Sequence, residues 1–172
     1  LTSLTDKLMN ALSNESEKDW YWFEDMMTYD NGILPLALLH SYEITGNTEV
    51  KQAALKSLDF LKEKTFSKQY LTPVGNNGFL RKNEPMPLFD QQAIEVMAMV
   101  LLFEQAYQVT KDAKYIELMF TSFMWFLGEN ELHIPLYDHE THGCCDGLQF
   151  NGINRNQGAE STLAYFIAHL TV

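Results

Sequence analysis

The chain has 172 residues, of which 46% are hydrophobic and 13% aromatic, which is enough for one globular domain with a sizeable core. Its formal net charge of -11 argues against nucleic acid, because phosphate binding needs clustered lysine and arginine, and it disfavours an anionic membrane surface. The longest uninterrupted apolar run, residues 96–103, is too short to cross a bilayer. We therefore expect a single cytoplasmic domain over residues 1–172, with no membrane segment, and, since its first residue is not Met, a fragment or C-terminal domain of a longer protein.

The first third of the chain predicts helices. Residues 4–12 carry apolar side chains at helical spacing with charges opposite, which indicates an outer, amphipathic helix. Residues 33–44 are apolar on almost every face and predict a helix that is buried all round. Gly46 ends this helix, and Asn47 can cap the amphipathic helix of residues 50–61.

The middle of the chain predicts a turn and a second buried helix. Residues 75–78, Gly-Asn-Asn-Gly, are a strong turn signal, so residues 70–74 and 78–82 are expected to form a small β-hairpin. Asp90 occupies an N-cap position before the apolar stretch of residues 93–106.

An internal repeat organises the remainder. Residues 42–47 align with residues 107–112, and residues 58–61 with residues 123–126, both at an offset of 65. The repeated unit is a pair of helices, one outer and one inner. Residues 115–127 and the apolar stretch from Leu163 to Leu170 extend this pattern, which predicts an all-α fold of three helical hairpins.

Each inner helix follows a long polar and aromatic loop, the longest of which is residues 132–161. Loops of this length are usually functional. The three inner helices should therefore start side by side at one end, where free N–H groups and partial positive charge gather. Such a face suits a neutral, hydroxyl-rich ligand, and a sugar is the obvious class.

Several segments of the chain resemble those of known families of helical proteins. The helix alternation and the turns between paired helices are similar to the α/α toroid of six-hairpin glycosidases and N-acylglucosamine epimerases. More specifically, four motifs resemble a bacterial helical-toroid domain that accompanies glycosyltransferases; they are Trp20-Tyr21-Trp22-Phe23-Glu24, Phe89-Asp90-Gln91-Gln92, Cys145-Asp146-Gly147-Leu148 and Asn154-Arg155-Asn156-Gln157-Gly158-Ala159-Glu160-Ser161. A complete toroid has about twelve helices, so this chain would form an incomplete ring. Its exposed apolar flanks predict self-association or packing against a missing domain.

Carboxylates are the candidates for catalysis, because glycoside hydrolysis uses one protonated and one ionised carboxyl group. The candidate catalytic residues are Glu24, Asp25, Asp90 and Asp146. The candidate substrate-binding residues are Trp20, Trp22, Asp30, Gln91, Asn156, Gln157 and Glu160. No cofactor is expected, and no metal, since the adjacent cysteines Cys144 and Cys145 lack the usual ligand spacing.

Structural roles remain open for most of these residues. Asp30 and Asp90 would serve equally as N-caps, and Glu160 would be favoured in a first helical turn by the helix dipole alone. Trp20 and Trp22 could belong to the core. The side-chain amides of Gln91, Asn156 and Gln157 could satisfy loop backbone groups. Tyr137 and Phe150 are expected to anchor the long loop.

Three functional hypotheses follow. The chain is a carbohydrate-active hydrolase or isomerase domain, a non-catalytic sugar-recognition domain that accompanies a glycosyltransferase, or a helical scaffold that binds a protein. No pair of residues in the sequence makes catalysis necessary, so whether the chain is an enzyme stays open.

Overall fold

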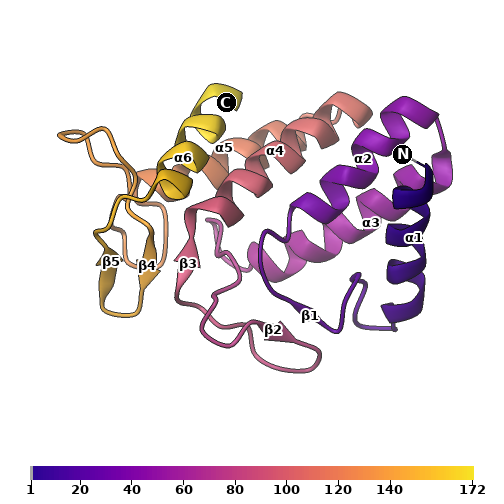
Figure 1. The fold of residues 1–172 in the computed structure, drawn as a ribbon, viewed down its shortest axis with the longest axis horizontal. Helices are drawn as coiled ribbons and strands as arrows, with labels where there is room; N and C mark the ends of the chain where they lie inside the picture. Colours follow the sequence, from indigo (N-terminus) through magenta and orange to yellow (C-terminus); the bar gives the residue numbers. More distant parts are fainter. Residues whose placement is uncertain (1) are drawn as a thin grey trace.

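The computed structural model describes residues 2–172 as an assembly of helices with short strands at one end (Figure 1). The helices are α1 (Thr2–Glu15), α2 (Ile33–Thr45), α3 (Thr48–Thr65), α4 (Ala93–Thr110), α5 (Lys114–Met124) and α6 (Ala159–Thr171), with a 3-10 turn, η1 (Trp125–Leu127), after α5. In the described chain α4 lies between α2 and α6, α3 packs on α2, and α5 packs on α4. The predicted all-α fold of paired outer and inner helices is confirmed.

Burial explains which helices are central. The inner helix α4 buries both Val96 and Val100 completely, along with Phe103. The outer helix α3 instead buries one stripe that includes Val50, Leu58 and Leu61, and leaves its lysine face in water. An apolar stripe on one face and polar residues on the other is the pattern that places a helix on the outside of a core.

Helix α2 is less buried than its composition predicts. Leu38 and Leu39 are fully buried, but Ile44 is 71% exposed and His40 is also exposed. The expectation of a helix that is buried all round is therefore wrong for α2. Helix α1 packs on α2, where the Thr5 hydroxyl lies 2.8 Å from the hydroxyl of the buried Ser41, but Ile44 at the end of α2 stays exposed.

The strands form two small antiparallel sheets. β1 (Met26–Met27) pairs with β2 (Leu80–Arg81), while β3 (Gln91–Gln92), β4 (Gly147–Gln149) and β5 (Gly152–Asn154) form a three-stranded sheet in that order. Registers such as Gln92 with Gly147 and Leu148 with Ile153 place the long loop beside the start of α4. The sheet thus attaches the longest loop to the middle inner helix.

The predicted β-hairpin around residues 75–78 is wrong. Leu80 pairs with Met27 of a distant segment, and the Gly75 N–H donates to the Pro87 carbonyl at 2.9 Å. A Cβ added to Gly75 would lie 2.0 Å from the Phe89 carbonyl oxygen, so this glycine serves a close backbone approach and not a hairpin turn. The hairpin that does form is β4–β5, inside the long loop.

One edge of the assembly exposes apolar side chains. On α6, Leu163 and Leu170 are 60% and 84% exposed, and Phe120 and Met124 on α5 are also exposed. An incomplete ring predicts such a flank, because no further helix of the described chain lies beyond α6 (Figure 1). Among residues 2–172, no helix has both the length and the apolar character that crossing a bilayer requires.

The cap of α3 gives a direct test of one local prediction. The Asn47 side chain accepts a hydrogen bond from the Glu49 N–H at 3.0 Å, as expected. We expect Asn47→Ala to lower the free energy of unfolding by about 1 kcal/mol, because one helical N–H loses its partner. Urea denaturation measures the change. Gln52→Ala, an exposed substitution in the same helix, is the control, and equal stability of the two variants would contradict the capping role.

Candidate active site

The three inner helices begin side by side, as predicted. The Asp30 N–H donates to Glu95 Oε1, and the Asn31 N–H and side-chain amide donate to Glu95 Oε2 at 3.2 and 3.1 Å. These bonds join the residues before α2 to the first turn of α4. The Tyr29 hydroxyl donates to Glu160 Oε1 at 2.8 Å and joins the same segment to α6. Three carboxylates therefore gather at the common end of the inner helices.

Glu95 is the member of this cluster that the sequence analysis missed. It is 4% exposed, and burial raises the pKa of its carboxyl to about 7, against hydrogen bonds from Asn31 and Asp30 that lower it. The signal that could have found it is the repeat. Residues 30, 95 and 160 are all acidic and follow one another at the offset of 65.

Asp30 has the environment of a proton donor. Burial, followed by the negative charge of Glu160, raises the pKa of its carboxyl to about 6. Its backbone φ is 53°, a left-handed conformation that non-glycine residues rarely adopt. Its Oδ1 is buried and has no hydrogen-bond partner among residues 2–172. The N-cap interpretation is wrong, since Gly32 precedes the first residue of α2.

A hollow of about 370 Å³ opens beside this cluster. Its lining combines side chains from the starts of α4 and α6 with the β3–β4–β5 sheet, and it includes Asp90, Gln92, Asp146, Gln149, Asn154 and Glu160. Of the predicted site, Asp90, Gln91, Asp146 and Glu160 line this hollow, whereas Asp30 is not among its lining residues. Asp90 is half-buried with a φ of 59°, and Gln92 occupies the N-cap position of α4, so the predicted cap role of Asp90 is wrong.

Asp146 has a structural role in this wall. Its carboxylate accepts hydrogen bonds from the Asn156 amide at 2.5 Å, the Gly158 N–H at 2.8 Å and the Ser161 hydroxyl at 2.9 Å. Burial acts to raise its pKa, but the three hydrogen bonds outweigh burial and hold the pKa below its usual value. Asp146 therefore stays ionised and fixes the start of α6, which makes it a poor proton donor.

The two predicted loop amides bind within the loop. The Asn156 amide is engaged by Asp146, while the Gln157 amide donates to Asp138 Oδ2 at 3.2 Å and its oxygen accepts from the Thr141 hydroxyl at 2.8 Å. Neither residue lines the hollow as a free donor. The partners of both amides are thus side chains of the same loop, whereas the structural alternative left open by the sequence was binding to loop backbone groups.

Glu24 and Asp25 lie elsewhere. Both are exposed and line a separate hollow of about 460 Å³ with Glu15, Phe23 and Met26. That hollow shares no lining residue with the one at the helix starts. The four predicted catalytic carboxylates are thus not brought into one site.

The predicted stacking of Trp20 and Trp22 on sugars is wrong. Trp22 is 0% exposed and Trp20 is 5% exposed. The Trp20 indole N–H donates to the Glu24 carbonyl at 2.8 Å, and its ring meets Phe60 edge-on at 5.4 Å. Both indoles are core residues, because the loop that contains them folds back over α3.

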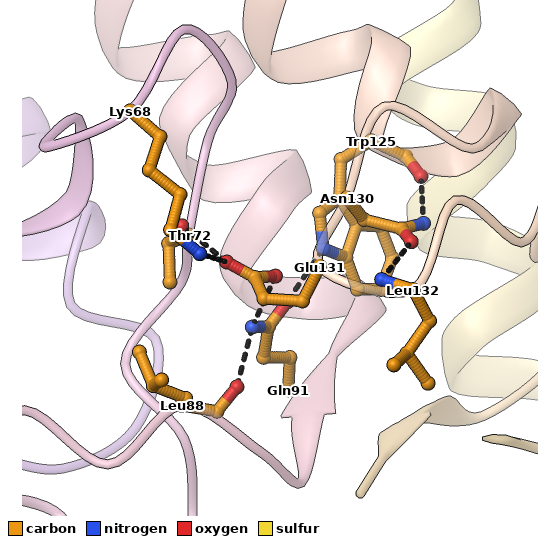
Figure 2. Close-up of polar contacts among 8 residues, drawn as sticks. All are labelled: Lys68, Thr72, Leu88, Gln91, Trp125, Asn130, Glu131 and Leu132. Atoms are coloured by element: carbon orange, nitrogen blue, oxygen red, sulfur yellow. Dashed lines mark hydrogen bonds and ion pairs between the residues drawn. The ribbon is translucent and has the colours of Figure 1, made fainter. Parts of the chain in front are cut away.

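Gln91 is held in a buried network of polar groups (Figure 2). Its amide donates to Glu131 Oε2 at 2.7 Å and to the Leu88 carbonyl at 2.6 Å, while its oxygen accepts from the Trp125 indole at 2.7 Å. Thr72 donates to Glu131, and Lys68 lies 3.7 Å from it. Gln91 also lines the hollow, but every polar atom of its amide has a partner within the protein, so its substrate-binding role stays a prediction.

Thiols and histidines do not assemble into a metal site in the described chain. Cys144 and Cys145 are both buried and free, and across residues 2–172 no three side chains of His, Cys, Asp or Glu are grouped as metal ligands would be. The carboxyl groups that line the hollow are those of Asp90, Asp146 and Glu160.

The buried carboxyl group of Glu95 predicts a measurable pH dependence. Its pKa is raised in the folded state, from 4.5 to about 7, so its proton stabilises the fold fully below about pH 4.5, and this contribution of about 3 kcal/mol is lost as the pH rises through 7. Glu95→Gln cannot titrate. The stability of the unaltered chain relative to Glu95→Gln should therefore fall between pH 5 and pH 8.

Urea denaturation of both chains at several pH values measures this difference. Glu117→Gln, an exposed glutamate on α5, is the control and should differ from the unaltered chain by the same amount at each pH. A constant difference for Glu95→Gln would show that the Glu95 carboxyl does not titrate in this range.

The fold and the carboxylate cluster define a class, the helical toroid with an acidic face at the starts of its inner helices. No protein-family model and no curated protein matches this chain. Among solved structures, the chain is similar to an α-1,6-mannanase, GH76A of Salegentibacter sp. HEL1_6, with a TM-score of 0.61 and 15% sequence identity. That structure is an inactive variant, in which two consecutive aspartates are replaced by asparagine, in complex with α-1,6-mannotriose.

The match covers 87% of this chain but 43% of the mannanase. It shows that the chain has the α/α toroid fold of glycosidases and that it spans less than half the length of this structural neighbour. The incomplete ring predicted from the helix count is therefore confirmed. The resemblance to domains that accompany glycosyltransferases stays a prediction.

Proposed function

We propose that this chain is a carbohydrate-active domain that binds a glycan at the hollow beside α4 and α6 and hydrolyses it with Asp30 and Glu160. The observation that carries the proposal is the joining of three helix starts by Asp30, Glu95 and Glu160, with the pKa of Asp30 raised to about 6. A structural neighbour with the same fold binds α-1,6-mannotriose, which supports a glycan as ligand.

The roles follow from exposure and charge. Asp30 is half-buried and, with its pKa raised to about 6, keeps its proton in mildly acidic solution, so it acts there as the general acid that protonates the leaving oxygen. Glu160 is exposed to the hollow and acts as the ionised partner, either nucleophile or base. The Tyr29 hydroxyl fixes one oxygen of Glu160.

Glu95 acts as a positioning residue. It is too buried to contact substrate, and its two oxygens accept hydrogen bonds from the backbone of residues 30 and 31. These bonds hold Asp30 in its left-handed conformation. This assignment replaces the predicted pair of Glu24 and Asp25, which lie in the other hollow.

A second candidate function is sugar recognition without catalysis. The structural neighbour is inactivated by changes at two consecutive aspartates, whereas the one adjacent acidic pair in this chain is Glu24-Asp25, away from the hollow at the helix starts. This observation favours a binding domain. A protein-binding scaffold, the third hypothesis, would use the same face without sugar affinity.

The exposed flank of α5 and α6 supports the predicted self-association or packing against a further domain. Leu163, Leu170 and Phe120 expose apolar surface there, and burying such surface against other helices is favourable.

A two-stage experiment separates the candidate functions. Thermal shift with linear manno-, gluco- and xylo-oligosaccharides, beginning with α-1,6-mannotriose, detects binding, and release of reducing ends detects hydrolysis. Stabilisation with turnover supports the hydrolase, and stabilisation without turnover supports the recognition domain. No shift with any glycan overturns both and leaves the scaffold.

A further inference from the structure

An exposed aromatic ring follows directly after Gln149, a residue that lines the hollow. Phe150 occupies the turn between β4 and β5 and is 79% exposed. Two-residue hairpin turns favour Asn and Gly because of their backbone angles, and a phenylalanine gives the turn no such advantage. The predicted role of Phe150 as an anchor of the long loop is therefore wrong, since an anchor would be buried.

The hairpin that carries Phe150 is firmly placed. β4 pairs with β3 on one side and with β5 on the other, and Leu148 is fully buried. Gly147 lies so close to β3 that an added Cβ would be 2.5 Å from the Gln91 carbonyl oxygen. The ring is thus presented at a fixed distance from the start of α4.

The neighbours of Phe150 relate it to the hollow. Gln149, the residue before it, lines the hollow, as does Asp90. Phe89, the residue before Asp90, meets the Phe150 ring edge-on, with centroids 5.4 Å apart and an interplanar angle of 86°. This contact orients the ring and leaves most of its surface exposed.

We propose that Phe150 is a stacking platform for a pyranose ring of the glycan that occupies the hollow, oriented by Phe89. A pyranose has an apolar face of C–H groups and a rim of hydroxyls, so it needs one aromatic surface and several polar groups. The structure offers the aromatic surface at Phe150 and the polar groups in the hollow that the neighbouring Gln149 lines. The predicted stacking function therefore belongs to Phe150 and not to the buried Trp20 and Trp22. This inference rests on the proposed glycan-binding function.

The test compares four proteins by isothermal titration with the oligosaccharide that gives the largest thermal shift in the glycan panel. Phe150→Ala should weaken Kd about tenfold or more through loss of aromatic contact area, while Phe150→Trp should bind at least as tightly as the unaltered chain. Phe120→Ala, an exposed phenylalanine on α5, should bind unchanged. Because Phe150 is exposed, its alanine variant should keep the Tm of the unaltered chain.

The outcomes separate this inference from the proposed function. If the unaltered chain binds a glycan and Phe150→Ala binds it equally well, the stacking platform is overturned and the proposed function stands. If Phe150→Ala and Phe120→Ala weaken binding to the same extent, the effect is not local to the hollow and the platform is again overturned. If the unaltered chain binds no glycan in the panel, the proposed function fails, and this inference fails with it.

Discussion

Asp30→Asn is expected to lower kcat for glycan hydrolysis by about a thousandfold, within the range that a positioned general acid contributes. Asparagine keeps the size of the side chain and the backbone N–H that donates to Glu95, but it has no proton to give to the leaving oxygen. The thermal shift with glycan should persist, because binding depends mainly on the hollow. Steady-state kinetics and thermal shift on the same preparation measure both quantities.

The pH profile gives a second measure of the same role. With the pKa of Asp30 near 6, kcat/KM should fall as the pH rises above about 6, because the acid loses its proton. The residual activity of Asp30→Asn should lack this alkaline decline. Asp25→Asn, in the separate hollow, is the matched control and should keep both rate and profile. Equal losses in the two variants would remove Asp30 from the reaction.

Glu131→Ala is expected to lower the free energy of unfolding by about 3 kcal/mol, because it leaves buried polar partners unpaired. Its carboxylate is 4% exposed and accepts hydrogen bonds from Gln91 and Thr72. Glu131 follows η1, Gln91 belongs to β3, and Thr72 lies between α3 and β2, so the network joins three segments that are distant in the sequence (Figure 2).

Chemical denaturation monitored by tryptophan fluorescence measures this change, and the Trp125 indole in the same network reports on it. Glu129→Ala, an exposed glutamate two residues away, should change stability by less than about 0.5 kcal/mol. If the two alanine variants were equally stable, the network would be no more than a set of weak surface contacts.

The helices could be predicted from the sequence because their signals are local. Apolar spacing along residues 4–12 and 93–106 and the cap at Asn47 depend on neighbours within a few residues, and the repeat offset of 65 fixes the alternation of outer and inner helices. The common end of the inner helices followed from that alternation. These expectations are confirmed by the bonds from Asp30 to Glu95 and from Tyr29 to Glu160.

The roles of individual polar side chains could not be predicted in the same way. The role of a polar side chain depends on whether its polar atoms are buried and on which distant atoms they contact, as Gln91, Trp22 and Asp146 show. For Gln91, one such partner, Glu131, lies 40 residues away in the sequence. Glu95 was missed because a single acid in an apolar helix gives no local signal, and only the repeat offset of 65 relates it to Asp30 and Glu160. Residues 76–78 do form a turn, but the predicted hairpin around it is wrong because the backbone of Gly75 and Asn76 pairs with Pro87 and Asp90.

The sequence by itself determined an all-α chain of paired helices with polar loops gathered at the starts of the inner ones, because helix periodicity and turn chemistry are short-range properties. Only the tertiary structure decided which carboxyl groups share a hollow, which aromatic rings are exposed and which are core. Burial and charge proximity are set by segments far apart in the chain, and these two quantities raise the pKa of Asp30 and Glu95.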